Sequence, residues 1–133
     1  MDLRPLYTLA GTAVVERLGK VQDGERLKIE FRGTAAPDSP VAGKAHGSAW
    51  ILVGPLGPGE TSAVQELVTA TGERIVLELR GYTINRDGGG MEIRASGLIR
   101  TSAAHFAEAN GRIALVVQTV SADNAVSVRA YQF

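Results

Sequence analysis

Apolar and polar residues alternate along most of the chain with a period of two, which is typical of β-strands that bury one face. The clearest case is 25–32, where Leu27, Ile29 and Phe31 alternate with charged residues. The same alternation, broken by clusters of glycine, proline, asparagine and aspartate, predicts further strands. They cover 63–70, 73–82, 91–100, 113–120 and 125–133, with one or two more in 41–53.

One segment, 101–111, is predicted to be helical. Its alanines favour a helix, Ser102 is a candidate N-cap, and Asn110-Gly111 is a candidate stop. The segment is too short to form a layer against a sheet, so the fold class is all-β. We expect a single antiparallel β-barrel of about eight strands with one short helical turn. A barrel is preferred to a sandwich because about eight strands close around just enough space for side chains or one small ligand.

Composition excludes several classes of protein. The chain of 133 residues has no cysteine, which excludes disulfide scaffolds, and its length fits one domain, 1–133. With 14 basic and 14 acidic residues it has no net charge, so we expect no binding to nucleic acid or to a membrane. With two histidines and no cysteine, no metal or other cofactor is predicted. The first residues lack the pattern of a signal peptide, and the cytoplasm is the expected location.

The candidate catalytic groups are Glu78, Arg80 and Tyr82 on the polar face of 73–82, with Arg94 on the neighbouring strand. Two interpretations of this face stay open. If it points into a cavity, an arginine holds a carboxylate or enolate oxygen while Tyr82 or Glu78 moves a proton, which suits cyclisation or isomerisation of a carbonyl compound. If the aliphatic face fills the interior instead, these side chains form a solvated exterior or an oligomer interface.

Three further residues are candidate ligand-binding groups. His46 and Trp50 are four positions apart in an alternating strand, so both lie on the same face, where they can stack against a ligand at the barrel mouth. In the alternative interpretation, Trp50 fills the barrel and His46 lies on the surface. Glu66 is expected across from Glu78 in the neighbouring strand.

Several short motifs spread over nearly the whole chain are shared with one protein family. They are Pro5-Leu6-Tyr7-Thr8-Leu9, Gly47-Ser48-Ala49-Trp50, Thr69-Ala70-Thr71-Gly72-Glu73-Arg74-Ile75, Ile99-Arg100-Thr101 leading into Phe106 and Ala109-Asn110-Gly111-Arg112, and Val128-Arg129-Ala130-Tyr131. In these motifs the chain resembles domain-of-unknown-function family 3237. The resemblance implies a barrel similar in shape to allene oxide cyclase and dirigent proteins that forms homo-oligomers. The expected fold is thus an allene-oxide-cyclase-like or lipocalin-like barrel. Where the family usually has aspartates, this chain has Ala49 and Ser62, so chemistry that relatives perform with those carboxylates is lost here.

These features together predict a small-molecule-binding barrel that acts as a cofactor-independent cyclase or isomerase of a small carbonyl-containing metabolite. One alternative is a non-catalytic carrier or sensor of a small hydrophobic ligand. Another is a structural oligomeric barrel that binds a partner protein. The expected partners are a small organic ligand and further copies of the chain, in a homo-dimer or higher homo-oligomer. A charged group inside the barrel would favour ligand chemistry, and an interior filled by side chains would favour the structural barrel.

Overall fold

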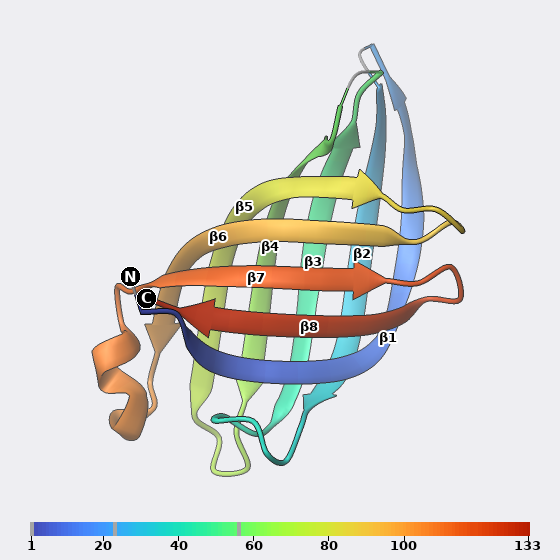
Figure 1. The fold of residues 1–133 in the computed structure, drawn as a ribbon. Coiled ribbons are helices and arrows are strands. Elements are labelled where there is room, and N and C mark those ends of the chain that lie inside the picture. The colour runs from blue at the N-terminus through green and yellow to red at the C-terminus, as the bar shows by residue number, and fades with distance from the viewer. Residues whose placement is uncertain (1, 23, 56) are drawn as a thin grey trace.

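The computed structural model describes residues 2–22, 24–55 and 57–133, and in these ranges the chain forms a closed β-barrel (Figure 1). Each strand pairs antiparallel with the next in the chain, and β8 returns to pair with β1. The strands of the described ranges are β1 (Arg4–Val21), β2 (Gly24–Ala35), β3 (Lys44–Val53), β4 (Gly59–Val68), β5 (Arg74–Asn85), β6 (Met91–Thr101), β7 (Ile113–Val120) and β8 (Ala125–Gln132). The predicted all-β barrel of about eight antiparallel strands is thereby confirmed.

Alternate side chains along the strands point into the barrel, as the period-two pattern predicts. On β2, for example, Leu27, Ile29 and Phe31 are buried, and the charged residues between them face outward. No lysine, arginine, aspartate or glutamate of the described residues is buried in the interior, where the polar side chains are neutral. The interior is therefore a packed and uncharged core. By the criterion given above, this result favours the structural barrel over ligand chemistry inside the barrel, and a small-molecule site would have to lie on the outer wall or at an end of the barrel.

The neighbouring strands β5 and β6 curve strongly from one side of the barrel to the other (Figure 1). Near the middle of the two strands, Gly81 and Gly97 allow the backbones to approach closely. A Cβ added at Gly81 would lie 1.9 Å from the carbonyl oxygen of Arg94, and one added at Gly97 would lie 1.7 Å from that of Glu78. Both distances are far below van der Waals contact, so only glycine fits at these two positions.

A chain of hydrogen bonds crosses the interior between side chains of β1, β4 and β7. The hydroxyl of Tyr7 donates to Oε1 of Gln65 at 2.8 Å, and Nε2 of Gln65 donates to Oε1 of Gln118 at 3.1 Å. Burial raises the pKa of Tyr7, which keeps its phenol protonated as the donor. Nε2 of Gln118 ends the chain and has no hydrogen-bond partner among the described residues.

Replacing Tyr7 by phenylalanine is expected to lower the free energy of unfolding by roughly 1–3 kcal/mol, because Oε1 of Gln65 then stays buried without its donor. Urea unfolding followed by circular dichroism measures this change. Tyr82→Phe is the matched control: Tyr82 is 57% exposed on the outer wall, so loss of its hydroxyl is expected to change stability by less than about 0.5 kcal/mol. Equal stability of the two variants would contradict the interior chain.

One end of the barrel is covered by the short 3-10 helix η1 (Ala104–Ala109). Ala103 and Ala109 are buried at its two ends, and Phe106 between them packs against the core. This segment is shorter than the predicted helix 101–111. No helix in the described ranges is long and apolar enough to cross a membrane.

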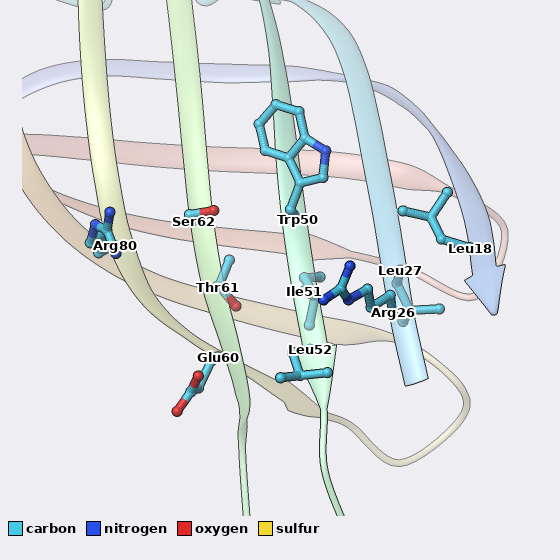
Figure 2. Close-up of a pocket in the computed structure, with 10 residues that line it drawn as sticks. All are labelled: Leu18, Arg26, Leu27, Trp50, Ile51, Leu52, Glu60, Thr61, Ser62 and Arg80. Carbon is cyan, nitrogen blue, oxygen red and sulfur yellow. The ribbon is translucent and has the colours of Figure 1, made fainter. Parts of the chain in front are cut away.

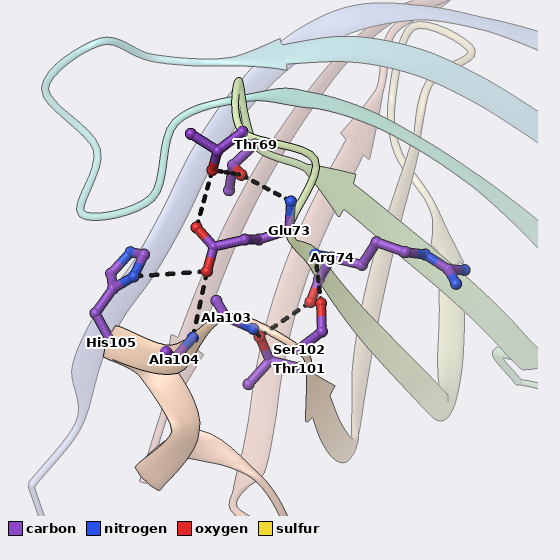
Figure 3. Close-up of polar contacts among 9 residues, drawn as sticks. Thr69, Glu73, Arg74, Thr101, Ser102, Ala103, Ala104 and His105 are labelled. Carbon is purple, nitrogen blue, oxygen red and sulfur yellow. Dashed lines mark hydrogen bonds and ion pairs between the residues drawn. The ribbon is translucent and has the colours of Figure 1, made fainter.

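Glu73 attaches η1 to the turn between β4 and β5 (Figure 3). Its Oε2 accepts a hydrogen bond from the backbone N–H of Ala104 at 3.2 Å and lies 3.7 Å from Nδ1 of His105. The prediction that Ser102 caps the helix is wrong. The Oγ of Ser102 accepts a hydrogen bond from the N–H of Arg74 at 3.0 Å instead, so Ser102 ties the end of β6 to β5 and the helix begins after it.

Candidate functional site

The structure places the four candidate catalytic side chains, Glu78, Arg80, Tyr82 and Arg94, on the outer wall of the barrel. They lie outside because the aliphatic residues that alternate with them fill the interior, as the exterior interpretation of this face predicts. Tyr82 is paired with Arg94 across β5 and β6. These four side chains therefore cannot act on a ligand inside the barrel. Any function that they have is on the outer surface.

Two neighbouring depressions, of about 340 and 380 Å³, hollow the outer wall around β4. Both are lined by Trp50 of β3, Ser62 of β4 and Arg80 of β5. We call the two depressions together the outer groove. Figure 2 shows the first of them, with Trp50 on one side, Arg80 on the other and Ser62 between them.

The strand register brings these three residues together. Trp50 is paired with Ser62, and Ser62 is paired with Arg80, so the three form one row across three strands. Neighbouring strands lie about 5 Å apart, which puts the backbones at Trp50 and Arg80 roughly 10 Å from each other. Because the side chain of Ser62 is small, the space above β4 between the indole and the guanidinium is open.

Trp50 presents an aromatic surface to this space. The residue is 44% exposed, and Nζ of Lys28 lies 5.7 Å from its ring centroid. Lys28 belongs to β2 and is held by Glu30, whose hydrogen bond raises the pKa of Lys28. Lys28 covers the indole from the β2 side and lines neither depression. The part of the indole that faces Ser62 and β4 is therefore accessible to a ligand.

Arg26 and Glu60, which the alternation alone does not single out, complete the first depression. The side chain of Arg26 extends from β2 toward β3, where Arg26 is paired with Leu52, and the carboxylate of Glu60 lies on β4 (Figure 2). Among the described residues, Arg26, Arg80 and Glu60 form no ion pair. Two guanidinium groups facing one carboxylate give this depression an excess of positive charge. Residue alternation in the sequence shows only that Arg26 and Glu60 face outward on β2 and β4, the two strands that flank Trp50, and many other charged residues share this property.

His46 lies on the same outer face of β3 as Trp50, as their spacing predicts, but in a different depression. It lines two hollows of about 690 and 290 Å³, and Trp50 lines neither. The alternative in which Trp50 fills the barrel is wrong, because the interior positions of β3 are taken by smaller buried residues such as Ala49 and Ile51. The structure therefore separates the two predicted ligand-binding residues.

Glu66 also lies away from the outer groove. It is paired with His46 on β3 and with Val76 on β5, so the expected position across from Glu78 is wrong by two residues. The length of the β4–β5 turn sets this register. The carboxylate of Glu66 forms an ion pair with Arg74, and this hydrogen bond lowers the pKa of Glu66.

Glu66→Gln is expected to lower stability at neutral pH by a fraction of a kcal/mol, because the ion pair with Arg74 is partly exposed. A lowered folded-state pKa means that this stabilisation is present above the unfolded-state pKa and is lost as the pH falls. The difference between wild type and variant is therefore expected to shrink from pH 7 to pH 3 in urea unfolding. Glu108→Gln, which alters an exposed carboxylate outside any ion pair of the described residues, is the control. A difference that grew on acidification would contradict the pairing.

Comparison with known proteins identifies the fold and no family. No family model matches the sequence, and no curated protein matches it. The barrel has solved counterparts. A protein of unknown function from Clostridium acetobutylicum superposes with a TM-score of 0.81 at 18% identity, covering 100% of this chain and 99% of that one. A β-barrel-like protein of Acinetobacter baumannii superposes with a TM-score of 0.78 at 23% identity, covering 98% and 94%.

An enzyme from Penicillium herquei shares the same architecture. It superposes with a TM-score of 0.67 at 15% identity, covering 98% of this chain and 93% of that one. At these identities the likeness shows the fold alone. The chain therefore shares its β-barrel with proteins of unknown function and with one fungal enzyme, and membership of family 3237 stays a prediction.

Proposed function

We propose that the outer groove binds a small, planar organic anion, with Trp50 stacking on its flat part and Arg80 binding its carboxylate. The observation that carries this proposal is the position of Trp50 and Arg80 on either side of Ser62. An indole offers a large flat apolar surface, and a guanidinium binds a carboxylate through two parallel hydrogen bonds. The separation of roughly 10 Å suits a molecule of the size of benzoate lying over Ser62.

The charges around the groove support an anion as the ligand. Arg26 and Arg80 line the first depression together with the carboxylate of Glu60, and Glu78 lines the second depression. Glu78 forms an ion pair with Arg100, so Glu60 is the one carboxylate of the groove without an ion pair among the described residues, and it stands against two guanidinium groups. Exposed charges attract an anion weakly across water, and more strongly once an apolar body excludes water from the contact. We therefore expect an acid to bind more tightly than a neutral molecule of the same shape.

Glu60 gives the groove a base as well as an anion site. In a bound carbonyl compound, Arg80 would hold the developing enolate oxygen while Glu60 takes the neighbouring proton, and this reaction needs no cofactor. It is the chemistry of the predicted isomerase or cyclase. The Penicillium herquei enzyme supports the use of this fold for catalysis. If no proton is transferred, the same groove makes the protein a carrier or sensor of the acid.

Trp50 is the only tryptophan of the chain, so its fluorescence reports directly on the groove. Titration with benzoate is expected to change the emission with a saturable curve in the millimolar range or below. Benzyl alcohol has the same ring without the charge and is expected to bind at least tenfold more weakly. A linear response to benzoate, or equal affinity for both compounds, would overturn the proposal.

Phenylpyruvate in heavy water separates an enzyme from a carrier. Its methylene protons exchange through an enol, so a base in the groove is expected to accelerate their loss from the proton NMR spectrum by about 100-fold or more over buffer. Glu60→Gln is expected to remove the acceleration and to preserve binding measured by Trp50 fluorescence. Exchange at the buffer rate with the compound bound would assign the groove to a carrier or sensor.

A further inference from the structure

The two ends of the barrel differ in how they are closed. At one end, η1 covers the core. Toward the other end, three apolar side chains of the inner face, Val15, Val53 and Met91, are only partly buried where they pack against the core. Together with Leu27 they line a depression of about 300 Å³. We call this depression the Met91 cup, and its apolar floor consists of these four side chains.

The rim of the Met91 cup is polar but carries little net charge. Asn85, Ser121 and Asn124 line it from the ends of β5 and β7 and from the β7–β8 turn. Arg17 and Glu25 also line it, and they form an ion pair with each other. The charges of Arg17 and Glu25 compensate each other in this ion pair. A ligand would therefore bind the rim mainly through hydrogen bonds to its neutral polar groups. The asparagine amides supply both donors and acceptors.

We propose that the Met91 cup binds a small, neutral, mainly apolar molecule with one hydrogen-bonding end, such as a medium-chain alcohol or ketone. The four apolar side chains exclude a charged group from the floor, where it would lose its hydration without a partner. The volume of about 300 Å³ lies at the lower end of the range for ligand pockets, which limits the ligand to a small molecule. Methionine is flexible, so Met91 can adapt to the shape of the guest.

This site is independent of the outer groove. Of the residues that line the Met91 cup, Leu27 alone also lines the groove, and the charged groups Arg26, Glu60 and Arg80 belong to the groove only. The two sites also differ in chemistry, because the groove offers guanidinium groups and the cup offers aliphatic surface. Failure of one proposal would therefore leave the other standing.

Methyl-labelled methionine provides a direct test, because the chain has two methionines, Met1 and Met91. Titration with 1-hexanol is expected to shift the carbon-13 methyl signal of Met91 with a saturable curve. The backbone amides of Asn85, Ser121 and Asn124 are expected to shift with the same midpoint. Sodium hexanoate has the same chain length with a charged end and is expected to bind at least tenfold more weakly. A Met91 signal that stays in place, or that moves linearly with hexanol, would overturn the proposal.

A pair of matched variants locates the binding. Val53→Asp places a carboxylate in the Met91 cup and is expected to weaken hexanol binding at least tenfold. Val14→Asp makes the same change on the outer face of β1, where Val14 is 68% exposed and lines neither the Met91 cup nor the outer groove, and it is expected to bind hexanol as the wild type does. Equal weakening in both variants would place the binding elsewhere and overturn the proposal. If Val53→Asp fails to fold, the amide shifts of the wild-type protein decide the question alone.

Discussion

Replacement of Gly97 by alanine is expected to lower the free energy of unfolding by about 3 kcal/mol, because overpacking of a well-packed structure costs about 1–3 kcal/mol and a clash with backbone lies at the high end. The new Cβ would lie 1.7 Å from the carbonyl oxygen of Glu78 and 3.0 Å from Cα of Leu79. Both neighbours belong to the backbone of β5, so no side-chain rotation relieves the contact. Urea unfolding followed by far-ultraviolet circular dichroism measures the loss.

Ser96→Ala is the matched control for this change. Ser96 precedes Gly97 on β6 and faces outward, so removal of its hydroxyl is expected to change stability by less than about 0.5 kcal/mol. If Gly97→Ala were as stable as Ser96→Ala, the close approach of β5 and β6 would be contradicted. The comparison also matters for the proposed function, because Ser96 and Gly97 both line the outer groove.

The same use of glycine occurs between β1 and β2. A Cβ at Gly11 would lie 1.9 Å from the carbonyl oxygen of Arg32, and Gly11 is paired with Gly33 across the two strands. Glycines at such positions let strands bend and close a barrel without clashes between neighbouring backbones. The many glycines that punctuate the sequence therefore include residues inside strands as well as in turns.

The alternation of residues predicts which side chains face inward, and it does so best where no bulge interrupts a strand. The inward residues of β2 and the bounds of β7 follow directly from the sequence. The pattern places β4 at 63–70 instead of Gly59–Val68, and it defines no strand where the longest strand, β1, lies. Its pairing with β2 shifts between Arg17 and Gly19, and its pairing with β8 shifts between Pro5 and Tyr7, so the parity of inward positions changes within the strand.

The candidate site is only partly predictable, for a physical reason. Residue parity is a local property, so it correctly places His46 and Trp50 on one face of β3. The meeting of Trp50 with Arg80 depends on two successive registers, from β3 to β4 and from β4 to β5. Each register is set by the length and shape of a turn, and an error of two residues in one turn misplaces Glu66. The sequence therefore shows which side chains face outward, but it does not show which of them meet across neighbouring strands.

Arg80→Ala is expected to weaken the binding of benzoate roughly 10- to 100-fold, because hydrogen bonds to a charged group contribute about 1.5–3 kcal/mol. Arg80 lines both depressions of the outer groove and forms no ion pair with another described residue, so its guanidinium is ready to bind an anion. Titration by the fluorescence of Trp50 gives the dissociation constant. Arg80→Lys keeps the charge but loses the planar fork of donors, and an intermediate affinity is expected.

Arg129→Ala separates this effect from a change in the overall charge of the protein. Arg129 is exposed on β8, outside both depressions of the outer groove, and its removal changes the net charge by the same amount. Benzoate affinity is expected to stay within twofold of wild type, because the field of a distant exposed charge is screened within about 10 Å at moderate salt. If both variants lost affinity equally, binding would depend on net charge rather than on the groove. If Arg80→Ala bound benzoate as tightly as wild type, Arg80 would not hold the carboxylate, and the function proposed for the groove would be wrong.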